Sequence, residues 1–365
     1  MRIAFYAPLK SPNHPVPSGD RQMARMLFAG LQSVGHEVEL ASELRAFSAS
    51  SAPGAHDDAK TAAQAEIARI SELWSRGSRP DIWFCYHPYY KAPDFIGPNL
   101  ASRFGLPCVT VEASYSSRRA TGAWVESQAI VSEAVRQAAV NICLRQKDRA
   151  GLQIVAPDAR YEMLDPFIET APFAGFEPQL AGRRIVTVAM MRPGDKLDSY
   201  RMLARTLERI EHLTWTLSIV GEGPCRDEVR SEFARLDPAR IDWLRGQLPS
   251  DMPRLYAQGC LYAWPGYGEA YGLAYLEAQA SGLPVVAQNI DGVPGVVRND
   301  ETGILTPPGD VGAYADSLAL LLEDLPLRRS MSEAARRFVF DERSFEIASA
   351  RLAAILEMIG KPGNG

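Results

Sequence analysis

Residues 265–293 read PGYGEAYGLAYLEAQASGLPVVAQNIDGV, a glycine-rich loop followed by a helical segment and an apolar strand. Three glycines of the loop, Gly266, Gly268 and Gly272, let the backbone come close to a ligand. The apolar spacing predicts a helix over residues 271–280, which Ser-Gly-Leu-Pro ends before a short buried strand, Pro-Val-Val-Ala. The stretch therefore predicts an α/β protein with a ligand site at a helix N-terminus.

Two carboxylates lie on either side of the helix start. Glu269 precedes the helix and Glu277 lies inside it, on the order of 8 Å from the start at a rise of about 1.5 Å per residue. The backbone amides at Tyr271, Gly272 and Leu273 are suited to bind an anion between the two. A sugar and a ribose joined by a diphosphate have about this separation. The alternative, an ordinary amphipathic helix before a strand, explains neither the glycines nor Glu269.

The pattern Glu269-x7-Glu277, followed by Ala-x-Ala-x-Gly-x-Pro-Val-Val-Ala, resembles the donor-site signature of retaining glycosyltransferases of family 4. The resemblance implies a GT-B architecture, in which two Rossmann-like domains face each other across a cleft and a C-terminal helix crosses back to the first domain. It also implies a hexosyltransferase that moves a sugar from a nucleoside diphosphate sugar to an acceptor hydroxyl with retention. Glu269 would then bind sugar hydroxyls, and Glu277 would bind the ribose.

Strands alternate with helical stretches along most of the chain, which predicts parallel α/β sheets. A chain of 365 residues is too long for one ordinary core and suggests two domains. We expect an acceptor-side domain over residues 1–175 and a nucleotide-sugar donor domain over residues 176–342. Residues 343–365 are expected to form the helix that packs back on the first domain.

Charge and cysteine content exclude several other classes of protein. Residues 1–175 carry 18 basic and 18 acidic side chains and the remainder carries 21 and 26, so neither half concentrates positive charge as a nucleic-acid binder would. Five scattered cysteines without a Cys-x-x-Cys motif predict reduced thiols in a cytoplasmic protein and argue against a structural zinc site. Because no run of 18 apolar residues occurs, no membrane-spanning helix is expected.

Arg192 and Lys196 follow an expected strand over residues 184–191. Two cations beyond the carboxyl end of a strand could clamp a diphosphate. Family 4 usually carries Gly-Arg-x4-Lys here, and its two cations stabilise the departing diphosphate. In this chain Met191 replaces the glycine and the spacing is one residue shorter. Two solvated loop cations are the alternative interpretation.

Two turns add candidate donor contacts. Ser18 and Gly19 precede the first long helix, where the resembled enzymes have a Gly-Gly loop near the donor phosphates and the acceptor. Ser18 replaces the first glycine and could donate a hydrogen bond. Gly221 follows an expected strand, and in the family this turn lies near the nucleotide. A helix-start turn and ordinary turn geometry explain the same residues without any ligand.

His87 and Glu112 each follow an expected strand of the first domain. His87 lies in the aromatic run 86–90 on the expected cleft side, where an imidazole and stacked rings could hold a sugar, although a lone histidine in such a loop is more often structural. Family members frequently have a histidine where this chain has Glu112, reaching the donor sugar near the reaction centre. Glu112 therefore either binds acceptor or sugar hydroxyls or indicates an unusual donor, and it could pair with Arg118 or Arg119.

The expected chemistry is loss of a diphosphate while positive charge grows on the sugar, and preorganised cations and helix dipoles act where such charge develops. The nucleoside diphosphate sugar is a substrate, so no cofactor is expected. No metal is expected either, because the sequence has no Asp-x-Asp motif. A sugar phosphorylase, a nucleotide-sugar epimerase or a degenerate nucleotide-sugar-binding protein on the same fold stay open as alternatives. A nicotinamide dehydrogenase is disfavoured because no Gly-x-Gly-x-x-Gly follows the first strand.

The acceptor is not indicated by these residues, and a lipid-linked or polysaccharide acceptor is implied only at the level of the family. The expected helix over residues 20–34 has Arg21 and Arg25 opposite Met and Leu side chains. Such a helix could rest on the anionic inner face of a membrane, giving a peripheral contact. The same pattern is expected of a helix packed on a sheet, so both interpretations stay open.

Overall fold

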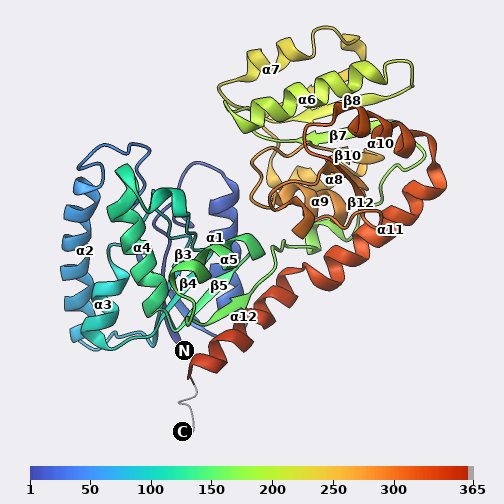
Figure 1. Ribbon diagram of the computed structural model, residues 1–365. Coiled ribbons are helices and arrows are strands. Elements are labelled where there is room, and N and C mark those ends of the chain that lie inside the picture. Colours follow the sequence, from blue (N-terminus) through green and yellow to red (C-terminus); the bar gives the residue numbers. More distant parts are fainter. Residues whose placement is uncertain (361–365) are drawn as a thin grey trace. The chain divides into compact units, whose positions relative to one another are not determined.

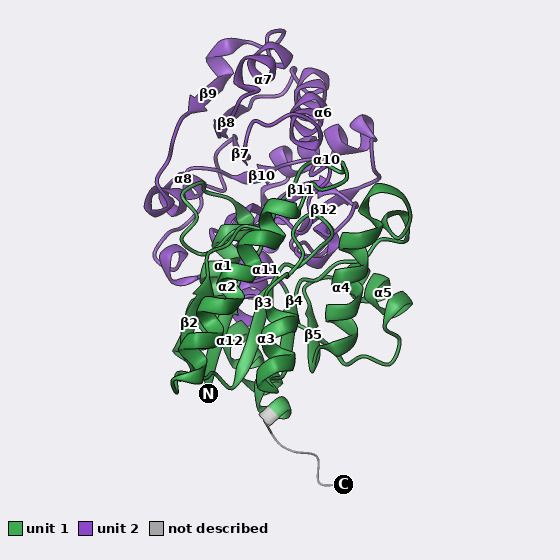
Figure 2. Cartoon of the chain, turned by 90° about the vertical axis from the view of Figure 1, so that its left-hand side faces the viewer, with its two compact units in different colours: residues 1–165, 345–365 green, residues 166–344 purple. Residues whose placement is uncertain are grey.

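The computed structural model describes residues 1–360 of the chain and divides into two compact units. Figure 2 colours them separately: the first unit comprises Met1–Asp165 together with the segment that begins at Phe345, and the second comprises Pro166–Ser344. Each unit is built on one six-stranded sheet whose neighbouring strands are all parallel. This confirms the predicted α/β class with two Rossmann-like domains.

The sheet of the first unit has the order β2-β1-β3-β4-β5-β6, so the chain starts next to the edge strand β2 and then adds β3 to β6 in order on the other side of β1. Figure 1 labels β3, β4 and β5 of this sheet. Its strands are β1 (Arg2–Tyr6), β2 (Glu37–Ser42), β3 (Ile82–Tyr86), β4 (Cys108–Val111), β5 (Val140–Cys143) and β6 (Tyr161–Met163). Its helices are α1 (Gly19–Ser33), α2 (Asp57–Ser75), α3 (Gly97–Phe104), α4 (Val125–Gln137), α5 (Gln146–Val155) and α12 (Phe345–Gly360), with 3-10 turns η1 (Ser117–Arg119) and η2 (Gly122–Trp124).

Alternation along β1 explains how this sheet is covered on both faces. Ala4 and Tyr6 belong to the core cluster that α2 and α3 complete, whereas the ring of Phe5 contacts the ring of Phe28 on α1 at 5.4 Å between centroids. Successive strand residues point to opposite faces, so a strand buried on both sides is apolar throughout. Loops follow the carboxyl ends of these strands, and these loops carry the polar groups described below.

The sheet of the second unit has the order β12-β11-β10-β7-β8-β9. Its strands are β7 (Arg184–Val188), β8 (Thr216–Val220), β9 (Ile241–Leu244), β10 (Leu261–Ala263), β11 (Val285–Gln288) and β12 (Gly303–Thr306). Its helices are α6 (Asp195–Arg209), α7 (Arg226–Glu232), α8 (Met252–Ala257), α9 (Leu273–Ala280), α10 (Val311–Glu323) and α11 (Leu325–Glu342), with 3-10 turns η3 (Ala171–Phe173), η4 (Pro238–Arg240), η5 (Pro249–Asp251) and η6 (Val293–Gly295).

Helix α12 follows the second unit in sequence but packs against α1 of the first. The contact is close because Gly30 of α1 has no side chain: a Cβ there would lie 2.9 Å from the Ser349 hydroxyl oxygen. Leu352, Ile355 and Leu356 of α12 are fully buried. The predicted return of the last helix to the first domain is thus confirmed, while residues 361–365 of the predicted segment lie outside the described residues.

The units divide after residues 165 and 344, where the sequence analysis placed the boundaries at 175 and 342. The segment after residue 165 packs within the second unit. The Ile168 amide donates to the Arg343 carbonyl at 3.0 Å, and the ring of Phe173 lies 6.4 Å from that of Tyr256. The prolines of this segment indicated that the chain passes there from the first domain to the second. They did not indicate with which of the two domains the segment packs.

Within residues 1–360, none of the helices combines the length and the apolar character that a membrane crossing requires.

Candidate functional site

Glu269 lies in the loop between β10 and α9, and its carboxylate is held by two neighbours. The indole N–H of Trp264 donates to Glu269 Oε1 at 2.9 Å, and the Lys196 ammonium forms an ion pair with the same oxygen. Only 15% of the Glu269 side chain is exposed, against 25% of the Lys196 side chain. The carboxylate is therefore fixed before any ligand arrives, and one of its oxygens is already occupied.

The glycines of this loop are required by its geometry. Gly266 has φ of 82°, and a Cβ there would lie 2.2 Å from the Tyr275 hydroxyl oxygen. Gly268 has φ of 63°, and its Cβ would lie 2.1 Å from Asp195 Oδ2. Left-handed backbone and such close approach both favour glycine. The loop is thereby pressed against the start of α6, which brings Glu269 to Lys196.

Lys196 lies in the first turn of α6, beyond the carboxyl end of β7. Its ammonium lies 5.5 Å from the centre of the Trp264 ring, and that ring packs edge-on against Tyr200 at 4.9 Å. Arg192, in contrast, is exposed and forms no side-chain hydrogen bond or ion pair within the described part of the chain. Of the two predicted clamp cations, Lys196 is thus held by Glu269, and Arg192 is exposed to solvent.

Glu277 lies on α9 and is half-buried. The buried Tyr256 hydroxyl donates to Glu277 Oε2 at 3.0 Å. Burial, with the neighbouring Glu277 charge, raises the pKa of Tyr256 well above its usual value, so the phenol keeps its proton and acts as a donor. This hydrogen bond fixes one carboxylate oxygen of Glu277. The position of the side chain therefore depends on both α9, which carries Glu277, and α8, which carries Tyr256.

At the start of α9 the side chains are buried, so the backbone is the part that a ligand could contact. The side chains of Tyr271 and Leu273 are each only 7% exposed, and Gly272 between them has φ of 70° as the residue before the helix. These residues can therefore meet a ligand mainly through their amides, which fits the predicted anion site at the helix N-terminus.

Gly221 has a structural reason to be glycine. A Cβ there would lie 1.9 Å from the Ala189 carbonyl oxygen, because the loop after β8 runs directly over the loop after β7. The Tyr200 hydroxyl donates to the same carbonyl at 2.7 Å. Gly221 therefore helps to place the Arg192–Lys196 loop, and its contact with a donor stays a prediction.

In the first unit, His87 and Glu112 follow the neighbouring strands β3 and β4, and both adopt left-handed backbone, with φ of 60° and 55°. The His87 amide donates to the Val111 carbonyl at 2.7 Å, and the Glu112 amide donates to the Ile142 carbonyl at 2.9 Å. Such backbone strain persists where the surroundings impose it, commonly at functional sites. The strands thus aim both side chains at the carboxyl edge of the sheet.

The ionisable side chains at this edge of the sheet shift one another's pKa values. Glu112 is buried and accepts a hydrogen bond from the Tyr86 hydroxyl at 3.0 Å; burial raises the pKa of Glu112. His87 Nδ1 lies 3.4 Å from Asp20 Oδ1. Burial alone would lower the pKa of His87, but the carboxylates of Glu112 and Asp20 outweigh it, so the pKa is raised. The edge favours a protonated imidazole between two carboxyl groups.

Three further charged residues near His87 and Glu112 were not predicted from the sequence: Asp20, Arg145 and Asp148. Arg145 follows β5 and binds Asp148 through a forked pair, with Nε–Oδ2 at 2.6 Å and Nη2–Oδ1 at 2.7 Å. A signal was available, because residues 140–144 read Val-Asn-Ile-Cys-Leu, a pattern typical of a buried strand, and Arg145 follows them directly. In the structure β5 lies beside β4, which Glu112 follows. Asp20 was hidden because it is held near His87 by tertiary structure alone.

Ser18 caps α1, and its hydroxyl oxygen accepts from the Arg21 amide at 3.3 Å. This is the helix-start role that the sequence left open as an alternative. Gly19 is exposed, with no atom within 4 Å of where a Cβ would lie. Its backbone is therefore open to a ligand, and the predicted donor contact of both residues stays a prediction.

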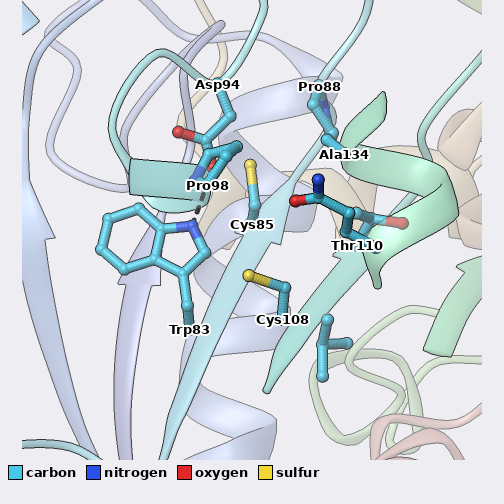
Figure 3. A pocket seen from close by; sticks show the side chains of 10 residues that line it. Trp83, Cys85, Pro88, Asp94, Pro98, Cys108, Thr110 and Ala134 are labelled. Atoms are coloured by element: carbon cyan, nitrogen blue, oxygen red, sulfur yellow. Dashed lines mark hydrogen bonds between the residues drawn. The ribbon is translucent and has the colours of Figure 1, made fainter. Parts of the chain in front are cut away.

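A small cavity beside β3 and β4 is a structural feature rather than a ligand site (Figure 3). Its volume of about 10 Å³ is near the minimum for one water molecule. The buried Asp94 beside it accepts from the Trp83 indole at 2.7 Å and from the amides of Ile96 and Gly97 at 2.9 and 2.8 Å. These contacts hold the start of α3.

The second unit is similar to a known protein family. Residues 182–324 match the family model described as "Glycosyl transferases group 1". The chain carries a group 1 glycosyltransferase domain. This glycosyltransferase domain contains Arg192, Lys196, Glu269 and Glu277, whereas His87 and Glu112 lie in the other unit.

Curated relatives extend the similarity beyond the glycosyltransferase domain. The D-inositol 3-phosphate glycosyltransferase of Salinispora arenicola is 30% identical over 286 residues, and that of Mycobacterium bovis is 28% identical over 309 residues. These alignments cover 69% and 77% of this chain. The chain spans 63% of the length of each relative.

Solved structures share the fold at lower identity. Sucrose-phosphate synthase from Thermosynechococcus elongatus gives a TM-score of 0.76 at 18% identity and covers 98% of both chains. Anabaena HepE, solved in complex with UDP and glucose, gives 0.72 at 15% identity and covers 98% of this chain and all of its own. The fold of this chain is the GT-B fold, as the sequence predicted.

Proposed function

We propose that the protein is a glycosyltransferase of family 4 that moves a sugar from a nucleoside diphosphate sugar to an acceptor hydroxyl with retention. The observation that carries the proposal is the cluster of Glu269, Lys196 and Trp264 beside the N-terminus of α9. It combines a fixed carboxylate, a cation and a helix N-terminus, which are the groups needed to bind a sugar and a diphosphate together. The group 1 family match and the complexes of HepE with UDP-glucose support the same conclusion.

The proposed donor pose follows from these groups. The diphosphate lies at the amides of Tyr271–Leu273, with Lys196 and Arg192 against its oxygens. The free oxygen of Glu269 binds sugar hydroxyls, and Glu277, held by Tyr256, binds the ribose. Arg192 closes on the phosphates only once they are bound, because it has no partner within the described residues.

In the proposed reaction the bond between the anomeric carbon and the diphosphate oxygen breaks, and both electrons leave with the diphosphate. The acceptor hydroxyl attacks the same face of the sugar, and its proton passes to the departing diphosphate oxygen. Lys196, Arg192 and the α9 dipole stabilise the negative charge as it develops, the type of contribution that is usually largest in such sites. His87 and Glu112 are proposed to hold acceptor or sugar hydroxyls at the edge of the first unit.

The proposal includes no cofactor and no metal, since the cations of the protein itself are assigned to the diphosphate. Neutralisation by Lys196, Arg192 and a helix N-terminus is the physical support for that assignment. We also propose a reducing, cytoplasmic setting. All five cysteines are free thiols, and four of them are buried.

The proposal is tested by thermal unfolding with UDP, GDP, ADP and their common sugar conjugates, with and without EDTA. Wild type is compared with Glu277→Ala and with a matched control, Glu333→Ala, which removes an exposed glutamate from α11. A ligand at about 100 times its dissociation constant adds about 2.7 kcal/mol to stability. We expect a selective stabilisation that survives EDTA, persists in Glu333→Ala and is lost in Glu277→Ala. No stabilisation by any nucleotide would contradict the proposal.

A further inference from the structure

The first unit contains a second, larger cavity on the side of the loops that follow its strands. The loop after β2 and the start of α2 form one wall, and η2 with the start of α4 forms the other. Its volume is about 60 Å³, several times the 10–15 Å³ that one water molecule needs. The cavity can therefore receive part of a ligand, such as the edge of a sugar ring with its hydroxyls.

The lining of this cavity is mainly polar and includes three ring side chains. The buried His56 ring lies 5.6 Å from Phe95 and 6.1 Å from Trp124, between ring centroids, and all three line the cavity. His56 is fixed by a hydrogen bond between Nε2 and the Lys91 carbonyl at 3.1 Å. Residues 50–55, which include Ser50 and Ser51, also line the cavity. A mainly polar lining with a few ring side chains matches the hydroxyl groups and the apolar C–H groups that a saccharide presents.

The charged side chains that line the cavity disfavour a negatively charged ligand. Lys60, the cation of the lining, lies 2.5 Å from Glu126 Oε1 and 3.8 Å from Asp57 Oδ1. Its charge is therefore already balanced, and the two carboxylates leave a net negative rim. A phosphate or carboxylate on a ligand would be repelled there, whereas neutral hydroxyl groups can bond to either sign.

A continuous series of ring contacts joins this cavity to His87. The His87 ring lies 5.1 Å from Tyr89, Tyr89 lies 5.4 Å from Tyr90, and Tyr90 lies 5.0 Å from Trp124. Arg119 lies over the Tyr90 ring at 5.0 Å. Tyr89 and Tyr90 are half-buried, so this band borders the surface between the two places. A series of packed rings thus links His87 to the cavity wall at Trp124.

We propose that this surface binds the acceptor, and that the acceptor is a neutral saccharide of more than one sugar unit. The reacting sugar lies at His87 and Glu112, the chain follows Tyr89 and Tyr90, and a further sugar enters the cavity at Trp124. This inference rests on the proposed function and adds the class of acceptor to it.

The test uses saturation-transfer NMR and calorimetry on the full chain, with maltotetraose, cellotetraose and chitotetraose beside their monosaccharides. Glucose 6-phosphate serves as the anionic probe. The variant Ala123→Trp fills the cavity from an exposed lining position and leaves the aromatic core intact. Its matched control, Ala129→Trp, adds the same ring to an exposed position of α4 outside the cavity.

We expect at least one tetrasaccharide to bind about tenfold more tightly than its monosaccharide, corresponding to about 1.4 kcal/mol. Ala123→Trp should abolish this advantage, Ala129→Trp should keep it, and both should retain the stabilisation by nucleotide. The inference is overturned if tetrasaccharides bind no better than monosaccharides, if the phosphorylated sugar binds best, or if Ala123→Trp binds like wild type. Tetrasaccharide binding without any nucleotide binding would uphold the saccharide surface and contradict the transferase proposal alone.

Discussion

In the second unit, the residues with left-handed backbone in the loop after β10 are glycines. In the first unit, the corresponding residues in the loops after β3 and β4 are a histidine and a glutamate. Gly266, Gly268 and Gly272 take left-handed backbone without a steric penalty. His87 and Glu112 take the same conformation as residues for which it is uncommon. One unit uses the missing side chains to bring its loop against Tyr275 and Asp195, and the other accepts strain in the backbone of His87 and Glu112.

The largest effect is expected at Lys196, which forms an ion pair with Glu269 in the glycine-rich loop of the second unit. Lys196→Ala removes the partner of Glu269 and the preorganised cation of the site. We expect release of nucleoside diphosphate from a donor sugar to slow by about 100-fold to 1,000-fold, as for removal of one stabilising donor from an active site. Single-turnover measurement of diphosphate release checks this.

Arg205→Ala is the matched control for Lys196→Ala, because Arg205 is an exposed cation of the same helix, α6. It should release the diphosphate at the wild-type rate. Equal rates in both variants would show that the position of the cation at Glu269 is unimportant for the reaction.

A smaller effect is expected when the backbone freedom of the second unit is removed. Gly266→Ala places a Cβ in left-handed backbone and against the Tyr275 hydroxyl, so we expect a loss of about 2 kcal/mol in the free energy of unfolding. Urea unfolding measures the loss. Gly295→Ala, where no atom lies within 4 Å of the new Cβ, should change stability by less than about 0.5 kcal/mol. A similar cost at both positions would remove the argument for glycine at 266.

The smallest effect concerns the charges of the first unit. The pKa values of Glu112 and His87 are both raised, so each contributes stability at low pH that is lost as the pH rises through its folded value. Glu112→Gln keeps the shape of the side chain and removes its ionisation. The variant should therefore gain stability relative to wild type as the pH rises above the ordinary glutamate pKa of about 4.3.

NMR titration of the His87 imidazole provides a second measurement on the same variant. Glu112 is the main group that raises the pKa of His87, so the pKa should fall in Glu112→Gln. An unchanged imidazole pKa, with stability that follows wild type at every pH, would mean that the two groups act independently.

The sequence predicted the fold well because its patterns are local. Apolar strands alternate with helical periods, and the loop–helix–strand unit at residues 265–288 keeps its glycines in positions that the structure requires. The exact domain boundaries were less predictable, since the side on which residues 166–175 pack depends on contacts with Arg343 and Tyr256 far along the chain.

The two candidate site regions differ in how far the sequence could describe them. Lys196 and Glu269 were both predicted from motifs, but their direct pairing across 73 positions was not, because it depends on the close approach at Gly268. In the first unit nothing in the sequence marks a histidine or glutamate that will adopt left-handed backbone. The cluster of Asp20, His87 and Glu112 arises only when neighbouring strands place their ends side by side.

The packing of α12 on α1 has a consequence for how the protein is made. The first unit comes off the ribosome before the second, yet it needs a helix that is translated only after residue 344. Until then the surface around Gly30 of α1 has no covering helix, while the second unit is already complete in one continuous segment. The unit that is synthesised first is thus the last to be finished, and during synthesis its open helix face is the part of the chain most exposed to aggregation.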